Sequence, residues 1–157
     1  MTDQRRRPPA VSPDVSQRLS RVRHRDTAPE MAIRRQLHSM GFRYRVDTRP
    51  DKSVRRRADL VFPRERIAVF VDGCFWHVCP EHGTWPKANA GWWREKLLAN
   101  ERRDRQTDET LRSSGWTVLR IWEHEDYVAA SQLIADAVGV ARIEMTVSKR
   151  RHFEIHD

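Results

Sequence analysis

Two short apolar runs near the middle of the chain limit its fold more than any other feature. Residues 58–62 read ADLVF and residues 67–71 read IAVFV, and only the four residues PRER separate them. Apolar runs of this length with a short turn between them are typical of two buried strands joined as a hairpin. We therefore expect these strands at the centre of a sheet that is covered on both faces.

The segments on either side of the hairpin predict the fold class. Thr27 and Glu30 have the spacing of a capping box, and Gly41 and Gly115 stand where helices would end. In chain order, we predict a helix over residues 28–40, a strand over 42–46, the two hairpin strands, a helix over 91–114, a strand over 116–122 and a last helix from Asp126. This order predicts an α/β fold with a mixed central sheet and helices on both of its faces.

The two ends of the chain differ in composition from the middle. Residues 1–16 are rich in Arg, Pro and Ser, so we expect a flexible basic arm there, and a flexible polar tail over residues 148–157. One domain over residues 17–147 remains, which is long enough to bury a core of its own. No apolar run of roughly 18 residues and no coiled-coil pattern is present, which favours a cytoplasmic monomer without a membrane span.

The charge of the chain favours a nucleic-acid partner. Lys and Arg number 30 against 22 Asp and Glu, which gives a net charge of +8, and most of the cations are arginine. The planar guanidinium group binds phosphate oxygens in pairs. A basic surface that serves only solubility is the alternative, and charge does not separate an enzyme from a binding module.

Thiol and imidazole side chains gather around an irregular segment. Cys74, Cys79 and His82 lie close together in the sequence. His124 follows the last predicted strand, which would return it to the same end of the sheet. Two thiolates and two imidazoles are a ligand set for structural zinc. On spacing alone two alternatives stay open, because His77 is an equally near ligand and the cysteines would also pack as apolar side chains.

Two aspartates stand where the hairpin would bring them together. Asp59 lies inside an apolar strand, and Asp72 ends the next one. Paired carboxylates hold a hard cation such as Mg²⁺, which offsets phosphate charge and activates water. His77 would serve as a general acid or base nearby. Backbone donors that satisfy Asp59 are the alternative, and the capping box by itself gives Glu30 a sufficient role in the first helix.

Two pairs of adjacent aromatic residues lie in polar parts of the chain. Phe75 and Trp76 belong to the irregular segment, and Trp92 and Trp93 begin the charged helix. Exposed rings among arginines are suited to stack on bases or to wedge into a duplex. The alternative is that one ring of each pair packs in the core and the other at its rim, as we expect at least for Trp92.

An ordered series of motifs resembles a known family. The motifs are RDTAPE at 25–30, DGCFWH at 72–77, CPEH at 79–82, WREK at 93–96, NERRD at 100–104, GW at 115–116 and WEH at 122–124. Over about residues 18–125 the chain resembles the very-short-patch-repair (Vsr) endonucleases. The resemblance implies a restriction-endonuclease-like, three-layer α/β/α fold. It also implies a nick in double-stranded DNA beside the thymine of a T:G mismatch, the product of 5-methylcytosine deamination.

The resemblance also implies roles for single residues. For Mg²⁺ and catalysis they are Asp59 as the main metal ligand, the Val71 carbonyl beside it, His77 acting at the phosphate or water, and Glu30 in support. For structural zinc they are Cys74, Cys79, His82 and His124. For the wedge that opens the duplex they are Phe75, Trp76 and Trp93.

The chain departs from the family pattern at Asp72. Family members can carry histidine there, so Asp72 either binds the metal or orients water. The lysine of the wider nuclease superfamily is also absent from residues 72–74, so proton transfer falls more heavily on His77. Two other functions suit the residues: a restriction or defence endonuclease of the same fold without mismatch preference, and a non-catalytic, zinc-stabilised DNA-binding module. Accessory mismatch-repair proteins are further candidate partners.

Overall fold

The structure is a computed structural model that describes residues 25–154. Its elements are α2 (Ala28–Ser39), β1 (Arg45–Thr48), β2 (Ala58–Phe62), β3 (Ile67–Asp72), α3 (Ala90–Ser113), β4 (Thr117–Trp122) and α4 (Tyr127–Glu154). The basic arm expected at residues 1–16 lies outside the described residues, as do the last three residues of the expected tail.

The four described strands form one mixed sheet in the order β1-β2-β3-β4. β1 and β2 pair antiparallel, β2 and β3 pair antiparallel as the predicted hairpin, and β3 and β4 pair parallel. In the hairpin Leu60 lies opposite Val69 and Phe62 opposite Ile67. The predicted α/β class and mixed sheet are therefore confirmed.

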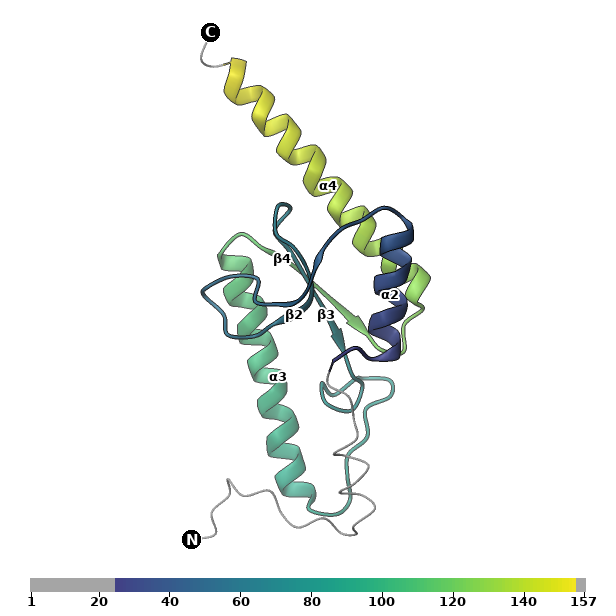
Figure 1. The fold of residues 1–157 in the computed structure, drawn as a ribbon. Helices are drawn as coiled ribbons and strands as arrows, with labels where there is room; N and C mark the ends of the chain where they lie inside the picture. The colour runs from purple at the N-terminus through teal and green to yellow at the C-terminus, as the bar shows by residue number, and fades with distance from the viewer. Residues whose placement is uncertain (1–24, 155–157) are drawn as a thin grey trace.

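Helices lie on both faces of this sheet (Figure 1). Alternate residues of β3 belong to two separate apolar clusters, with Ile67 and Val69 in one and Ala68 and Phe70 in the other. The first cluster includes residues of α2 and α4, and the second includes Leu111 of α3. The side-chain alternation of a strand thus supplies both cores from one short apolar run.

The parallel pairing of β3 and β4 requires a long crossover connection. Residues 73–89 form an irregular loop after β3, and α3 then leads back to the start of β4. In the register of the pair, Asp72 lies beside Trp122. The segments that follow β3 and β4 therefore leave the sheet at the same edge, which is where the chemistry-bearing residues gather.

The first strand begins later than predicted. β1 starts at Arg45, whereas the alternating pattern predicted a strand over residues 42–46. Phe42 and Tyr44 instead pack edge-on against Phe62, with ring centroids 6.5 and 5.9 Å away. The Tyr44 hydroxyl also donates a hydrogen bond to the Arg34 carbonyl of α2 at 2.6 Å. Packing against the helix and core therefore replaces strand pairing at these two residues.

Both predicted helix-ending glycines do end helices. Gly41 and Gly115 have φ values of 90° and 82°, a left-handed conformation that glycine adopts without a steric penalty. After α3, the N–H of Gly115 donates to the Arg112 carbonyl and the N–H of Trp116 donates to the Leu111 carbonyl, both at 3.0 Å. This pair of bonds is a Schellman motif, which satisfies carbonyls at the helix end.

The last helix is longer than predicted. α4 continues to Glu154, beyond residue 148 where we expected a flexible tail to begin, so residues 148–154 are helical. Basic side chains in its last turn, Arg151 and His152, suit the negative end of the helix dipole. Among the described helices, none is long and apolar enough to cross a membrane.

Candidate active site and metal centre

The four predicted zinc ligands come together at the edge where β3 and β4 end. The ligand atoms of Cys74, Cys79, His82 and His124 all lie within 4.8 Å of one another. The Nδ1 atom of His124 is 3.1 Å from Cys74 Sγ and 3.7 Å from Cys79 Sγ. Two thiols and two imidazoles grouped in this way fit the tetrahedral donor set that zinc prefers.

Backbone hydrogen bonds shape the loop that carries three of these ligands. The N–H of Cys79 donates to the Cys74 carbonyl at 3.0 Å, and the N–H of Gly83 donates to the Cys79 carbonyl at 2.8 Å. A Cβ atom at residue 83 would lie 2.4 Å from the Cys79 carbonyl oxygen, so glycine is required there. From the segment after β4, the Glu123 carboxylate accepts a hydrogen bond from the Cys74 N–H at 2.8 Å.

His77, the alternative ligand on spacing, is engaged with α3 instead. Its Nδ1 atom forms a short hydrogen bond with Asp104 and lies 3.7 Å from Oδ1 of Asp72. Arg56 donates to the other Asp104 oxygen at 2.8 Å. Burial alone would raise the pKa of Asp104, but the contacts with His77 and Arg56 hold that pKa at about 2. Asp104 is therefore ionised near neutral pH and holds the imidazole in one orientation.

Asp72 is buried and pairs with an arginine of β4. The Nη1 atom of Arg120 donates to both Asp72 oxygens, at 2.9 and 3.0 Å. The same guanidinium donates to Asp108 from Nη2 at 2.8 Å and from Nε at 3.0 Å. Burial raises the pKa of Asp72, while the charge of Arg120 lowers it. One arginine thus offsets the charges of two carboxylates, which makes Asp72 less available to a metal ion than expected.

Asp59 and Glu30 form a second acidic group at the same edge. Oδ2 of Asp59 accepts a hydrogen bond from the Val71 N–H at 2.6 Å, and no other residue among 25–154 forms a hydrogen bond to the Asp59 carboxylate. Burial raises the pKa of Asp59 to about 6, and the nearby charges of Glu30 and Asp72 contribute to the rise. Glu30 is only 2% exposed, and burial raises its pKa against a hydrogen bond from the Thr27 backbone. The Glu30 carboxylate therefore accepts a capping hydrogen bond at the start of α2, and its charge contributes to the raised pKa of Asp59.

Three residues of this charge network were not singled out as site residues from the sequence: Asp104, Asp108 and Arg120. The spacing of Asp104 and Asp108 on α3 places them on the same helical face as the buried Leu111. Arg120 similarly interrupts the otherwise apolar strand TVLRIW. The sequence signal for this network was the presence of charged residues at core-facing positions of both α3 and β4.

The predicted wedge residues form one aromatic cluster. Phe75 lies 5.0 Å from Trp76 and 5.5 Å from Trp93, measured between ring centroids. Trp92 extends the cluster, with its ring 4.9 Å from that of Trp93. All four rings are partly exposed, so Trp92 is not a buried core residue. The first turn of α3 and the loop after β3, which also carries three of the metal-ligand residues, together present these rings.

The chain is similar to several known proteins. Residues 12–81 match the family model described as DNA mismatch endonuclease Vsr. The Type II nicking enzyme V.NaeI of Lentzea aerocolonigenes is 41% identical over 133 residues, which are 83% of this chain and 80% of that enzyme. The Type II nicking enzyme V.XorIIP of Xanthomonas oryzae is 38% identical over 68% of this chain and 77% of its own length. The DNA mismatch endonuclease Vsr of Escherichia coli K12 is 34% identical over 69% of this chain and 68% of its own length.

The α/β fold brings carboxylates, a histidine and a thiol–imidazole set to one edge of the sheet. Together with these relatives, this site defines a DNA endonuclease, a hydrolase of phosphodiester bonds. The non-catalytic DNA-binding module considered above does not agree with that class. Within the class, the chain belongs to the DNA mismatch endonuclease Vsr family.

Proposed function

We propose that the protein is a Mg²⁺-dependent endonuclease that nicks one DNA strand beside the thymine of a T:G mismatch, as in very short patch repair. In this proposal the sheet and its helices are a restriction-endonuclease-like, three-layer fold with one structural zinc. The observation that carries the proposal is the Asp59 carboxylate, which has one hydrogen bond from Val71 and shares its sheet edge with the held imidazole of His77.

Asp59 fits a ligand for a hard cation. Its charge is disfavoured by burial and by three neighbouring carboxylates, so a bound cation would relieve an electrostatic cost that the chain alone does not offset. Oδ1 of Asp59 and the Val71 carbonyl are the oxygen donors we assign to Mg²⁺. When bound, the ion would offset phosphate charge and lower the pKa of water. Glu30 adds negative charge on the α2 side.

His77 is the residue that we assign to proton transfer. With Nδ1–H directed to the ionised Asp104, the Nε2 atom becomes the proton-accepting nitrogen of a neutral ring. The carboxylate fixes the tautomer and stabilises the imidazolium that forms when Nε2 accepts a proton. We assign Asp72 to orienting this group and not to metal binding, because Arg120 occupies both of its oxygens.

The aromatic cluster is the feature that we assign to mismatch recognition. A mismatched step is less stable than a paired one, so inserting rings between its bases costs less there than in a matched duplex. Phe75, Trp76 and Trp93 lie in contact with one another, and Trp76 directly precedes His77 in the chain. One such set per chain suits the cleavage of a single strand, and several relatives are named as nicking enzymes.

A nicking assay tests this function. Three labelled duplexes that differ only in a T:G, T:A or C:G pair are incubated with the purified protein and Mg²⁺, with His77→Ala and Asp59→Asn variants as controls. We expect one nick, on the thymine strand of the T:G duplex, that requires Mg²⁺ and the Asp59 carboxylate. Nicking of the T:A or C:G duplex at a similar rate would instead support a restriction or defence enzyme.

A further inference from the structure

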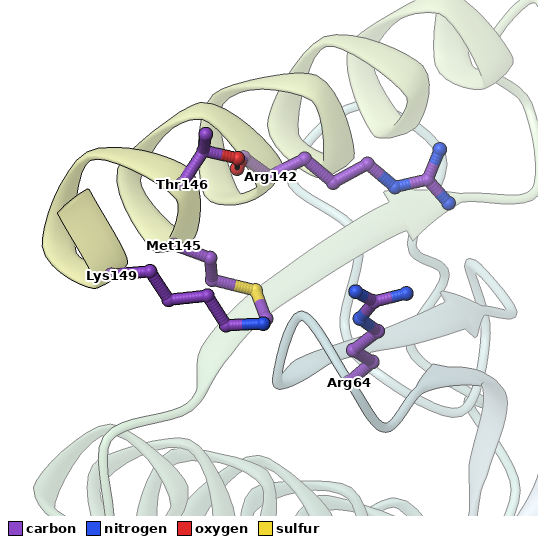
Figure 2. A pocket seen from close by; sticks show the side chains of 5 residues that line it. All are labelled: Arg64, Arg142, Met145, Thr146 and Lys149. Carbon is purple, nitrogen blue, oxygen red and sulfur yellow. Dashed lines mark hydrogen bonds between the residues drawn. The ribbon is translucent and has the colours of Figure 1, made fainter. Parts of the chain in front are cut away.

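A cationic pocket lies between the second half of α4 and the turn that joins β2 to β3. It has a volume of about 470 Å³ and is lined by Arg142, Met145, Thr146 and Lys149 of α4 and by Arg64 of the turn. Figure 2 shows Arg64 and Lys149 extending from opposite sides towards the same space. Two elements that lie far apart in the sequence therefore direct three cations into one pocket. We name these five residues the α4–turn pocket.

The Arg142 guanidinium is held in place by its neighbours. Its Nε atom donates to the Glu65 carboxylate at 2.9 Å, and the Glu65 side chain is only 7% exposed. The guanidinium carbon also lies 5.5 Å from the centroid of the Phe42 ring. Its two Nη groups form no hydrogen bond with another residue among 25–154. Arg142 is therefore fixed in position and still has N–H donors that can bind an oxyanion.

The other two cations of the pocket have no carboxylate partner. Neither Arg64 nor Lys149 forms an ion pair with another residue among 25–154. Arg66 of the same turn differs, because it donates to the Ser114 carbonyl at 2.5 Å and lies over the Trp116 ring. Like charges that converge on one pocket repel each other, and a bound anion would offset that repulsion. The charges of the pocket therefore favour an anionic ligand.

We propose that the α4–turn pocket binds the phosphate backbone of a second DNA segment, separate from the segment that is nicked. Arg142 and Lys149 are seven residues apart, which corresponds to about 10 Å along a helix. The phosphates of one strand rise about 3.4 Å each along the duplex axis, so these two cations span about three phosphates. Guanidinium groups also bind phosphate oxygens in pairs. DNA is, moreover, the polyanion on which endonucleases of this family act.

The position of the pocket separates it from the proposed nicking site. The turn directly precedes Ile67 at the start of β3, whereas Asp72 ends that strand at the edge where the proposed catalytic residues gather. A strand of six residues is about 20 Å long. The turn and the second half of α4 therefore lie at the opposite end of the sheet from the loop over residues 73–89 (Figure 1). A duplex that lies across the nicking edge would leave the pocket accessible to another segment.

The number of duplexes that one chain binds tests the proposal. A short, matched, labelled duplex is titrated into the full chain in Mg²⁺-free buffer at low salt, and sedimentation velocity measures the mass of each complex. We expect one chain to bind two duplexes, the second with a dissociation constant on the order of 10 μM. Matched duplexes suffice for this measurement, so a chain that failed to nick a T:G pair would still test the second site.

Substitutions in the pocket show where the second duplex binds. Arg64→Gln and Lys149→Gln should each weaken the second binding step severalfold and lower its salt dependence by about one phosphate contact, while the first step and the nicking rate stay unchanged. Arg142 is kept, because the buried Glu65 depends on it. Arg151→Gln is the matched control, since it removes one charge from the opposite face of the same helix, about 180° from the pocket. Circular dichroism verifies that each variant remains folded.

Four results would overturn the proposal. The first is a chain that binds one duplex at every concentration. The second is an Arg151→Gln variant that weakens the second step as much as the pocket variants do. The third is a loss of affinity for the first duplex in Arg64→Gln or Lys149→Gln, which would mean that one segment contacts both the pocket and the nicking edge. The fourth is displacement of the second duplex by poly-glutamate as readily as by unlabelled DNA, which would assign the pocket to an acidic protein.

Discussion

The buried Asp59 carboxylate, which we propose as a cation ligand, should lower the stability of the fold when no cation is bound. Burial raises its pKa from 3.8 to about 6, so the folded state disfavours the ionised form above pH 6. We predict that Asp59→Asn raises the free energy of unfolding in metal-free buffer at pH 7.5 by up to about 3 kcal/mol. The gain should shrink as the pH falls from 6 towards 4, where the wild-type carboxyl is already protonated. Urea denaturation at several pH values measures it.

Asp59 also determines the direction in which the nicking activity should change with pH. Protonation of Asp59 below about pH 6 competes with Mg²⁺ for the carboxylate, so activity should fall as the pH falls through that value.

Mg²⁺ should also raise the melting temperature of the wild type but not of Asp59→Asn. An equal rise in both proteins would mean that the ion binds elsewhere.

Arg120 is the second residue whose replacement should change the stability of the fold. We predict that Arg120→Met destabilises the fold by on the order of 3 kcal/mol, because it leaves the buried Asp72 without its partner. Adding Asp72→Asn to this variant should restore part of the loss, since the more deeply buried of the two carboxylates is then neutral and only Asp108 lacks its arginine. Denaturation of the single and double variants measures this coupling. The control is Arg112→Met, an exposed change near the end of α3.

Among the elements, the loop between β3 and α3 depends most on its proposed metal. We predict that Cys79→Ser lowers the zinc content of the purified protein and makes residues 73–89 more sensitive to limited proteolysis. His77→Ala should retain full zinc, because Asp104 and not the ligand set engages its Nδ1 atom. Elemental analysis of both variants distinguishes a zinc ligand from the histidine that we assign to proton transfer. Zinc loss in His77→Ala, or unchanged zinc in Cys79→Ser, would contradict the assignment.

The aromatic cluster belongs to two elements and should act as one unit. We predict that Trp76→Ala weakens binding to a T:G duplex more than binding to a matched duplex, because stacking and deformation supply the difference between them. Trp85→Ala is the control, since this exposed tryptophan of the same loop has no ring contact with the cluster. Fluorescence anisotropy with both duplexes measures the effect. Equal losses of affinity for both duplexes would mean that the cluster does not recognise the mismatch.

Local sequence patterns predicted most of the elements because each depends on its own residues. The hairpin strands and the glycines that end α2 and α3 are confirmed as expected. The start of β1 was wrong because Tyr44 gains more from α2 and Phe62 than from strand pairing, a tertiary preference that alternation does not reveal. The Asp72–Arg120 pair was missed for the same reason, since a 48-residue separation hides the contact. Spacing left His77 and His82 equivalent, and only the position of α3 separates them.

At the scale of the whole molecule, the salt dependence of DNA binding should be separable from the preference for a mismatched duplex. With a net charge of +8, the logarithm of the affinity for any duplex should fall linearly with the logarithm of the salt concentration, because binding releases counterions from phosphate. We predict similar slopes for T:G and matched duplexes and a constant offset between them. Titrations at several salt concentrations measure both quantities. Slopes that differ strongly would mean that cations, and not the aromatic rings, read the mismatch.

The crossover between β3 and β4 also has a kinetic consequence. The hairpin closes over a few residues, whereas pairing Asp72 with Trp122 must first bring together chain segments separated by the whole of α3. Long-range parallel pairing of this kind slows folding, because loop-closure entropy is lost before the contacts form. The ligand set joins Cys74 and Cys79 to His124 across that same loop. A zinc ion bound early would hold the two ends of the crossover together, so the metal supply would set how fast newly made chains mature.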